Sequence, residues 1–163
     1  MMDKDLSRAI AIDEIPHLSG ASHDGTPMTV TREQRDQFER LTLVDRAHPE
    51  LDPPEFPADI VEGFHALALL DAMSELARPF DPATTYAYNY GLDRVRWTSP
   101  VRIGDQLQSR FECTGVDPKG IGWLVRWSCT VTVLGSQKPA MVAEWLVYVL
   151  PRDTRPASPT AQD

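Results

Sequence analysis

Four side chains able to move a proton occur as two pairs, Asp45 with His48 and Glu62 with His65, each pair three residues apart. A carboxylate and an imidazole can act together as general base and general acid on one water molecule. Gly63, directly after Glu62, has no side chain and would let a ligand approach the backbone closely. These five residues are the first candidates for a reactive site.

Each candidate also has a structural interpretation. Asp45 and His48 stand among charged residues, as in a solvated loop. Glu62 would stabilise the start of a helix whether or not it reacts. His65 shares a predicted helical face with apolar residues; if buried it needs a hydrogen-bond partner, and its pKa would be lowered. Gly63 could serve the tight packing of a helix on a sheet.

The overall composition excludes several classes of function. The chain has 163 residues, which predicts one domain, and 16 basic against 24 acidic residues give a net charge of -8. This charge disfavours binding to nucleic acid or to an anionic membrane. An acidic N-terminus and the lack of a run of about 18 apolar residues argue against a signal peptide and a membrane span. We therefore expect a cytoplasmic protein.

The two cysteines, Cys113 and Cys129, lie in predicted strands without the spacing of a zinc site, so no metal is expected. A hairpin that turns at residues 118–121 would place Cys113 opposite Arg126 and Cys129 opposite Arg110. The two thiols would then not face each other. We expect no disulfide, as is usual in a reducing compartment.

The two ends of the chain differ in composition from its middle. Residues 1–28 mix acids, Gly, Ser and Pro around one short apolar stretch, and residues 152–163 combine Pro and Ala with small polar residues. We expect a loosely held N-terminal arm and a disordered C-terminal tail. Residues 29–151 would form the single folded domain.

Two helices are predicted ahead of the strands. Thr31, followed three residues later by Gln34, forms a capping-box pattern for a first helix, with Phe38 and Leu41 on its apolar stripe. A second helix is expected over residues 59–77 after a proline-rich loop. Apolar residues surround most of this second helix, so it must be buried.

Segments rich in β-branched and aromatic residues fill the rest of the chain, at residues 84–90, 92–99, 107–117, 122–134 and 140–150. Apolar and polar residues alternate within them, as in half-exposed antiparallel strands. A long buried helix followed by strands with short turns predicts an α+β domain in which a curved antiparallel sheet wraps the helix, the hot-dog fold.

Residues 89–105 read NYGLDRVRWTSPVRIGD: Tyr90 and Gly91 precede a strand of alternating basic and apolar residues, and Pro100 and Gly104 bracket the following turn. This segment resembles the MaoC-like family of R-specific enoyl-CoA hydratases and dehydratases, within the hot-dog superfamily. The resemblance extends over residues 28–150. It implies a hydratase or dehydratase of acyl thioesters, with coenzyme A or the phosphopantetheine of a carrier protein as substrate handle and no cofactor.

The resemblance also implies roles for the candidate residues. In the family, Phe-Ala-x-x-Thr-Gly-Asp-x-x-x-x-His supplies the catalytic Asp and His, and a His-Gly pair opens the central helix. Asp45 and His48 correspond to that Asp and His with a shorter spacing, while Val44 falls on the ungapped Asp position. Glu62 takes the place of the His before Gly63.

Hydration of an enoyl thioester needs a base, an acid and N–H donors for the developing enolate. The N–H of Gly63, at the start of the central helix, would hold the thioester oxygen, and His65 is a substitute acid or base. Arg94, Arg96 and Arg102 lie where basic residues outnumber acidic ones. They would contact the phosphates of coenzyme A, or else pair with acidic residues on a solvated surface.

Two further functions fit the same sequence. A hot-dog thioesterase would use Glu62 to attack the thioester or to activate water. A catalytically silent subunit would bind an acyl ligand or pair with an active partner, as the altered spacing of Asp45 and His48 indicates. A single sheet wrapped on a helix leaves strand edges open, so we expect a homodimer, or a heterodimer with another hot-dog subunit.

Overall fold

The computed structural model describes residues 9–47 and 59–152 of the chain. The elements, in order, are the 3₁₀ helix η1 (Ile12–His17), β1 (Ser22–Asp24), β2 (Met28–Thr29), α1 (Arg32–Thr42), α2 (Val44–Ala47), α3 (Gly63–Ala77), β3 (Thr85–Trp97), β4 (Gln106–Lys119), β5 (Gly122–Val133) and β6 (Pro139–Pro151).

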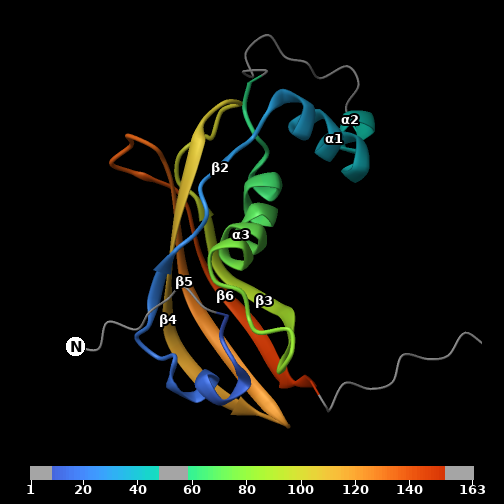
Figure 1. The fold of residues 1–163 in the computed structure, drawn as a ribbon. Coiled ribbons are helices and arrows are strands. Elements are labelled where there is room, and N and C mark those ends of the chain that lie inside the picture. The colour runs from blue at the N-terminus through green and yellow to red at the C-terminus, as the bar shows by residue number, and fades with distance from the viewer. Residues whose placement is uncertain (1–8, 48–58, 153–163) are drawn as a thin grey trace, which may run out of the picture.

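The strands form one antiparallel sheet in the order β1-β4-β5-β6-β3, and β2 also pairs with β4. The long helix α3 lies on one face of this curved sheet, and α1 and α2 lie toward the end where α3 begins (Figure 1). The hot-dog arrangement expected from the sequence is therefore confirmed. Strand β3 is left at one edge of the sheet.

Helix α1 begins with the predicted capping box. The Gln34 N–H donates to Thr31 Oγ1 at 3.2 Å, and the Thr31 N–H donates to Gln34 Oε1 at 2.9 Å. The predicted apolar stripe is only half correct. Phe38 packs against α3, but Leu41 is 84% exposed.

Helix α3 begins at Gly63 instead of residue 59. The preceding residues are extended: Ile60 forms a β-bridge with Arg102, and the Val61 N–H donates to the Val101 carbonyl at 2.8 Å. These backbone hydrogen bonds compete with helix formation, and α3 begins only after Glu62, whose own backbone is still extended.

The prediction that α3 is buried on nearly all sides is wrong. Leu70 and Met73 face the core, but Phe64 and Leu76 are 71% and 68% exposed, because one sheet covers only one side of a helix. None of the helices in the described ranges has the length and apolar character needed to cross a bilayer.

The predicted segments 84–90 and 92–99 form the single strand β3, which has irregularities between Asn89 and Gly91 and between Asp93 and Arg96. The three remaining segments correspond to β4, β5 and β6. Along β5 the predicted alternation is confirmed for the four residues that reach the core, Val125, Trp127, Cys129 and Val131.

The β4–β5 hairpin corrects the predicted cysteine partners. Cys113 pairs with Trp127 and Cys129 pairs with Phe111, each one position away from the expected arginines 126 and 110. Gly120 has a φ of 55°, which a tight turn requires, so the turn centres on residues 120 and 121 instead of 118–121. Both thiols are free, and burial raises their pKa values to about 11 and 12.

The prediction of a loosely held arm over residues 1–28 is wrong for residues 9–28. Ile10, Ile15 and Leu18 are at most 1% exposed and belong to the main core. The reason is length: α3, with 15 residues, spans about 22 Å, while β4, with 14, spans about 46 Å. Element η1 packs on the part of the sheet that α3 leaves open. The predicted tail lies outside the described residues from 153 onward.

Candidate active site

The first turn of α3 brings two of the predicted residues together. Glu62 is at the N-cap position, where its side chain makes no capping hydrogen bond, and His65 follows three residues later, a spacing that places both on one side of a helix. Helix α1 covers this end of α3, with Arg35 contacting Glu62 and Phe38 contacting His65. The site is therefore built by α1 and α3, two helices that are not adjacent in the sequence.

His65 is buried with one nitrogen unpaired. The side chain is 7% exposed, and its ring stacks on Phe38 with centroids 4.5 Å apart and an interplanar angle of 7°. Nδ1 has no hydrogen-bond partner among the described residues. Burial lowers the pKa of His65, although the nearby Glu62 acts in the opposite direction. The imidazole is therefore favoured in its neutral form.

Two carboxyl groups share one guanidinium in this site. Arg35 Nε lies 3.3 Å from Glu62 Oε1, and Arg35 Nη2 lies 2.6 Å from Glu39 Oε1. Glu62 Oε2 is buried without a described hydrogen-bond partner. Burial and hydrogen bonding to Glu62 raise the pKa of Glu39 to about 7, against the effect of Arg35.

This arrangement suits acid–base chemistry near neutral pH. The Glu39 carboxyl, with its raised pKa, could supply an acid beside the carboxylate of Glu62 as a base within one site. The first N–H groups of α3 have no acceptor within the helix, and the helix dipole favours negative charge there. The chemistry that fits is proton transfer to and from a substrate that develops negative charge.

Gly63 has a structural role that the coordinates show directly. Trp97 Nε1 donates a hydrogen bond to the Gly63 carbonyl at 2.8 Å, and a methyl group at Gly63 would lie 2.7 Å from the Trp97 ring. Such a contact is too short, so only glycine allows the ring to pack here. The predicted contact of Gly63 with a thioester stays a prediction.

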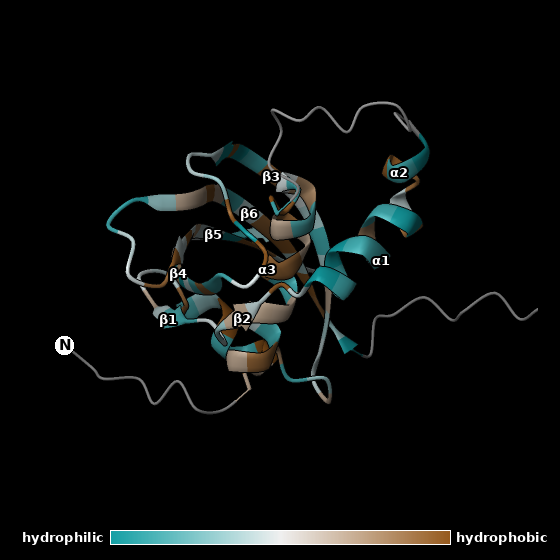
Figure 2. Cartoon of the chain, turned by 90° about the horizontal axis from the view of Figure 1, so that it is seen from above, coloured by the Kyte–Doolittle hydropathy of each residue, from teal (hydrophilic) through white to brown (hydrophobic). Residues whose placement is uncertain are grey.

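Of the other predicted pair, only Asp45 lies within the described residues. Asp45 lies exposed on α2, which packs on α1 and stands apart from α3 (Figure 2). The chain reverses at Leu43, whose φ of 62° ends α1 and carries α2 away. His48 lies outside the described residues, and the catalytic role predicted for the pair stays a prediction.

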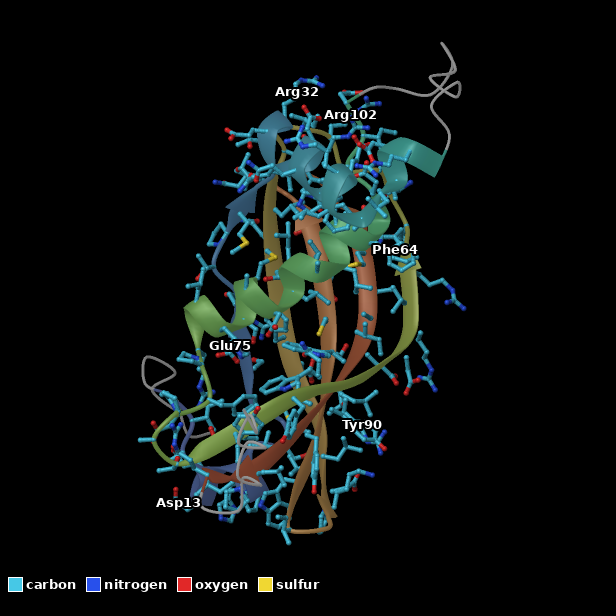
Figure 3. The ribbon with its side chains drawn as sticks, turned by 90° about the vertical axis from the view of Figure 1, so that its right-hand side faces the viewer. Asp13, Arg32, Phe64, Glu75, Tyr90 and Arg102 are labelled. Carbon is cyan, nitrogen blue, oxygen red and sulfur yellow. The ribbon has the colours of Figure 1, made fainter. Side chains whose placement is uncertain are left out.

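The three predicted coenzyme A ligands lie on the surface. Arg94 pairs with Glu144 at 2.8 Å, and Arg102 contacts both carboxylate oxygens of Asp59 at 2.7 Å, which lowers the pKa of Asp59. Arg96 is exposed and donates to its neighbouring backbone carbonyl. Ion pairing thus accounts for two of the three, and phosphate binding stays a prediction. Figure 3 places Arg102 at the end of the molecule where α3 begins.

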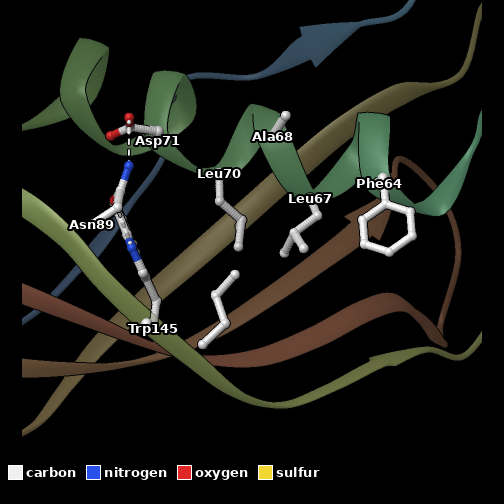
Figure 4. A pocket seen from close by; sticks show the side chains of 9 residues that line it. Phe64, Leu67, Ala68, Leu70, Asp71, Asn89 and Trp145 are labelled. Carbon is white, nitrogen blue, oxygen red and sulfur yellow. Dashed lines mark hydrogen bonds between the residues drawn. The ribbon is translucent and has the colours of Figure 1, made fainter. Parts of the chain in front are cut away.

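A cavity of about 490 Å³ opens between α3 and β3 beside the site. Phe64, in the first turn of α3, marks one end of it (Figures 3 and 4). Its apolar lining comes from Phe64, Leu67, Ala68, Leu70 and Leu92, and its polar lining from Asp71, Asn89 and Trp145. A mostly apolar cavity of this kind can hold a flexible hydrocarbon chain. Glu39, Glu62 and His65 are not among its lining residues, but Phe64, which precedes His65 in the first turn of α3, is.

The described residues include no cluster of three or more His, Cys, Asp or Glu that could bind a metal.

Arg35 and Glu39 were not predicted from the sequence. Their spacing of four residues is typical of an ion pair along one helix face, and Phe38 lies on the same side. That pattern could have singled out the pair. It does not say that this face of α1 covers the start of α3, because that contact depends on tertiary packing.

Comparisons with known proteins agree with this architecture. Residues 50–126 match the family described as a MaoC like domain. Nodulation protein N of Rhizobium leguminosarum bv. viciae is 36% identical over 105 residues, which make up 63% of this chain and 65% of that protein. The chain thus matches less than two thirds of that relative's length.

A second relative is covered more fully. The 3-hydroxyacyl-thioester dehydratase Z of Mycobacterium tuberculosis is 34% identical over 126 residues, 74% of this chain and 82% of that protein. The solved structure of the R-hydratase PhaJ1 from Pseudomonas aeruginosa superposes with a TM-score of 0.62 at 21% identity, covering 91% of this chain and 97% of the other, and shows the same fold. On these findings the chain belongs to the MaoC-like dehydratase family of hot-dog proteins.

Proposed function

We propose that the protein is a hydratase or dehydratase of acyl thioesters, which adds water to the α,β double bond of an enoyl thioester or removes it from a 3-hydroxyacyl thioester. One observation supports this most directly: at the N-terminus of α3, one carboxyl oxygen of Glu62 is buried and has no hydrogen-bond partner in the part of the chain that the structure describes. Membership of a dehydratase family supports the reaction class.

In the hydration direction, Glu62 takes a proton from water as the water oxygen bonds to the β-carbon. The π electrons move toward the thioester oxygen, where first-turn N–H groups of α3, including that of Gly63, stabilise the enolate. The α-carbon then takes a proton from Glu39, whose raised pKa keeps it available near neutral pH. Transfer of the proton from Glu62 to Glu39 restores the site, with one water added.

His65 has a supporting role in this scheme. Its neutral ring and unpaired Nδ1 can hold the water molecule beside Glu62. The thioester itself acidifies the α-carbon, so the reaction needs no cofactor. Coenzyme A or a carrier-bound phosphopantetheine would serve as the handle, with Arg94, Arg96 and Arg102 as candidate phosphate contacts.

A second hot-dog subunit, identical or different, would complete the assembly. Strand β3 forms one edge of the sheet and pairs only with β6 within the described ranges, and Leu92 on it and Phe64 beside it are 42% and 71% exposed. An edge strand with exposed apolar side chains can pair with another chain. Pairing along β3 would also cover the open side of the cavity.

A catalytically silent, acyl-binding subunit is the second candidate function. The exposed position of Asp45 favours it, because the residue that resembles the family's catalytic Asp lies on α2, a helix that stands apart from α3 (Figure 2). In that case the cavity would bind a ligand without converting it, and an active partner would perform the chemistry.

The test is an assay of the purified protein with crotonyl-CoA and longer enoyl-CoA substrates, in which the enoyl absorbance and the free thiol are recorded together. A decrease in the enoyl absorbance without release of free thiol is the result expected for a hydratase. Thiol release would instead assign a thioesterase, in which Glu62 attacks the thioester or activates water. Absence of both signals would contradict the proposed reaction and favour the second candidate function, a catalytically silent subunit.

A further inference from the structure

A chain of hydrogen bonds crosses one end of the cavity between α3 and β3. Trp145 Nε1 on β6 donates to Asn89 Oδ1 on β3 at 2.9 Å, and Asn89 Nδ2 donates to Asp71 Oδ2 on α3 at 3.3 Å. Figure 4 shows these three side chains at the end of the cavity opposite Phe64. Three elements thus contribute one polar group each to a bridge across an otherwise apolar space.

A second cavity, of about 420 Å³, begins on the other side of this bridge. It shares Asp71, Asn89 and Trp145 with the first cavity, and its further lining includes the charged side chains of Glu75 and Arg152. The bridge therefore separates an apolar compartment beside the first turn of α3 from a compartment of mixed character nearer the other end of the helix, where charged side chains stand beside apolar ones such as Phe80 and Val147.

The geometry points to a polar stop: we propose that Asp71, Asn89 and Trp145 limit the length of the acyl chain that the cavity accepts. The identity of the ligand rests on the proposed function. A chain that starts with its thioester near Glu62 and runs along α3 meets the bridge at Asp71. Residues 64 to 71 of the helix rise by about 10 Å, which suits a short or medium acyl chain.

The physical basis is the difference between the two compartments. Each methylene buried in the apolar compartment should tighten binding about fourfold. A methylene pushed against the bridge would instead remove water from the Asp71 carboxylate or break the hydrogen bonds of Asn89, and both changes oppose binding. The affinity should therefore rise with chain length and then level off or fall.

The test is calorimetric titration with saturated acyl-CoA ligands from butanoyl to dodecanoyl, which cannot be hydrated. For the wild type, the affinity should rise over the shorter chains and stop rising at a defined length. In Asp71→Ala, the rise should continue, so that the longest ligands bind at least about tenfold more tightly than to the wild type. Alanine favours an exposed helix position, so the variant should fold.

Glu75→Ala is the matched control, because it removes the same charge one helical turn later, from a residue that lines the second cavity and not the first. It should keep the wild-type cut-off. Asn89→Ala, which breaks the same bridge from β3, should extend the cut-off as Asp71→Ala does.

Three results would contradict the proposed limit on chain length: a chain length of maximal affinity that is unchanged in both bridge variants, an equal change in Glu75→Ala, or no binding of any acyl-CoA. The enoyl-CoA assay judges the proposed reaction separately. If the affinity stops rising at a defined chain length but no enoyl-CoA is converted, the proposed reaction would be contradicted and the proposed limit on chain length would still hold.

Discussion

Arg35 holds the carboxyl groups of Glu39 and Glu62 together above the first turn of α3, and the ring of Phe38 fixes that of His65. The sequence pointed to Glu62 and His65 because they stand at the start of a strongly apolar helical segment. It could not reveal Arg35 and Glu39 as their partners, because a helix pattern shows which residues share a face but not what that face contacts.

A second buried histidine lies away from this site. His23 is 5% exposed, its Nε2 lies 3.3 Å from Ser74 Oγ, and its ring stacks on Phe111. Burial, with a smaller effect from Arg78, lowers the pKa of His23 to about 4. The folded protein therefore keeps this ring neutral at pH values where the unfolded chain protonates it.

This pKa predicts a pH-dependent stability. Between about pH 6.5 and 4 the unfolded chain binds a proton that the folded protein does not, so the free energy of unfolding falls as the pH falls. The contribution of His23 between pH 7 and 4.5 should be about 2–3 kcal/mol. Urea unfolding of wild type and His23→Gln at both pH values measures it.

The wild type should lose more stability on acidification than His23→Gln, whereas a His17→Gln control, at an exposed position, should behave as the wild type. An equal loss in the wild type and His23→Gln would show that the ring is not the group responsible.

Helix and strand positions were largely predictable, because local patterns determine them. The capping box at Thr31 and the alternation along β5 both appear where expected. The position of the N-terminal segment was not predictable, because its buried residues, Ile10, Ile15 and Leu18, follow neither a helical nor a strand period. Their burial follows from the part of the sheet that α3 does not reach.

Ile15 tests this role of the N-terminal segment. The side chain is fully buried in the main core, so Ile15→Ala should lower the free energy of unfolding by about 2–5 kcal/mol. Ile121→Ala, at a residue that is 60% exposed, is the control and should change it by about 0.5 kcal/mol or less. Denaturant unfolding compares them, and similar small effects for both would mean that the segment is only loosely attached.

At the scale of the whole molecule, the sheet ends in a long strand, β3, which among the described residues pairs only with β6. Strand β3 has 13 residues and bears the exposed Leu92 and Trp97, with Phe64 of α3 packed on Trp97. The sequence suggested an open edge because one sheet around one helix must have one. It could not identify β3 as that edge, because strand order depends on long-range pairing.

Disruption of this edge should weaken self-association. We expect the wild type to form dimers in sedimentation velocity experiments and Leu92→Asp to dissociate at least about tenfold more readily, because the charge would be buried on pairing. Leu134→Asp places the same charge at a 55% exposed position outside β3 and should leave the dimer unchanged. A monomeric wild type, or equal effects of the two substitutions, would contradict pairing through β3.

The most direct test of the site compares hydration of crotonyl-CoA by the wild type, Glu62→Gln and Asp45→Asn. If Glu62 is the base, its replacement should lower kcat by about 10²–10⁴, while Asp45→Asn, at an exposed residue on α2, should stay within about twofold of the wild type. Loss of hydration in Asp45→Asn together with full activity in Glu62→Gln would contradict the assignment. It would place the chemistry at the pair that resembles the family motif.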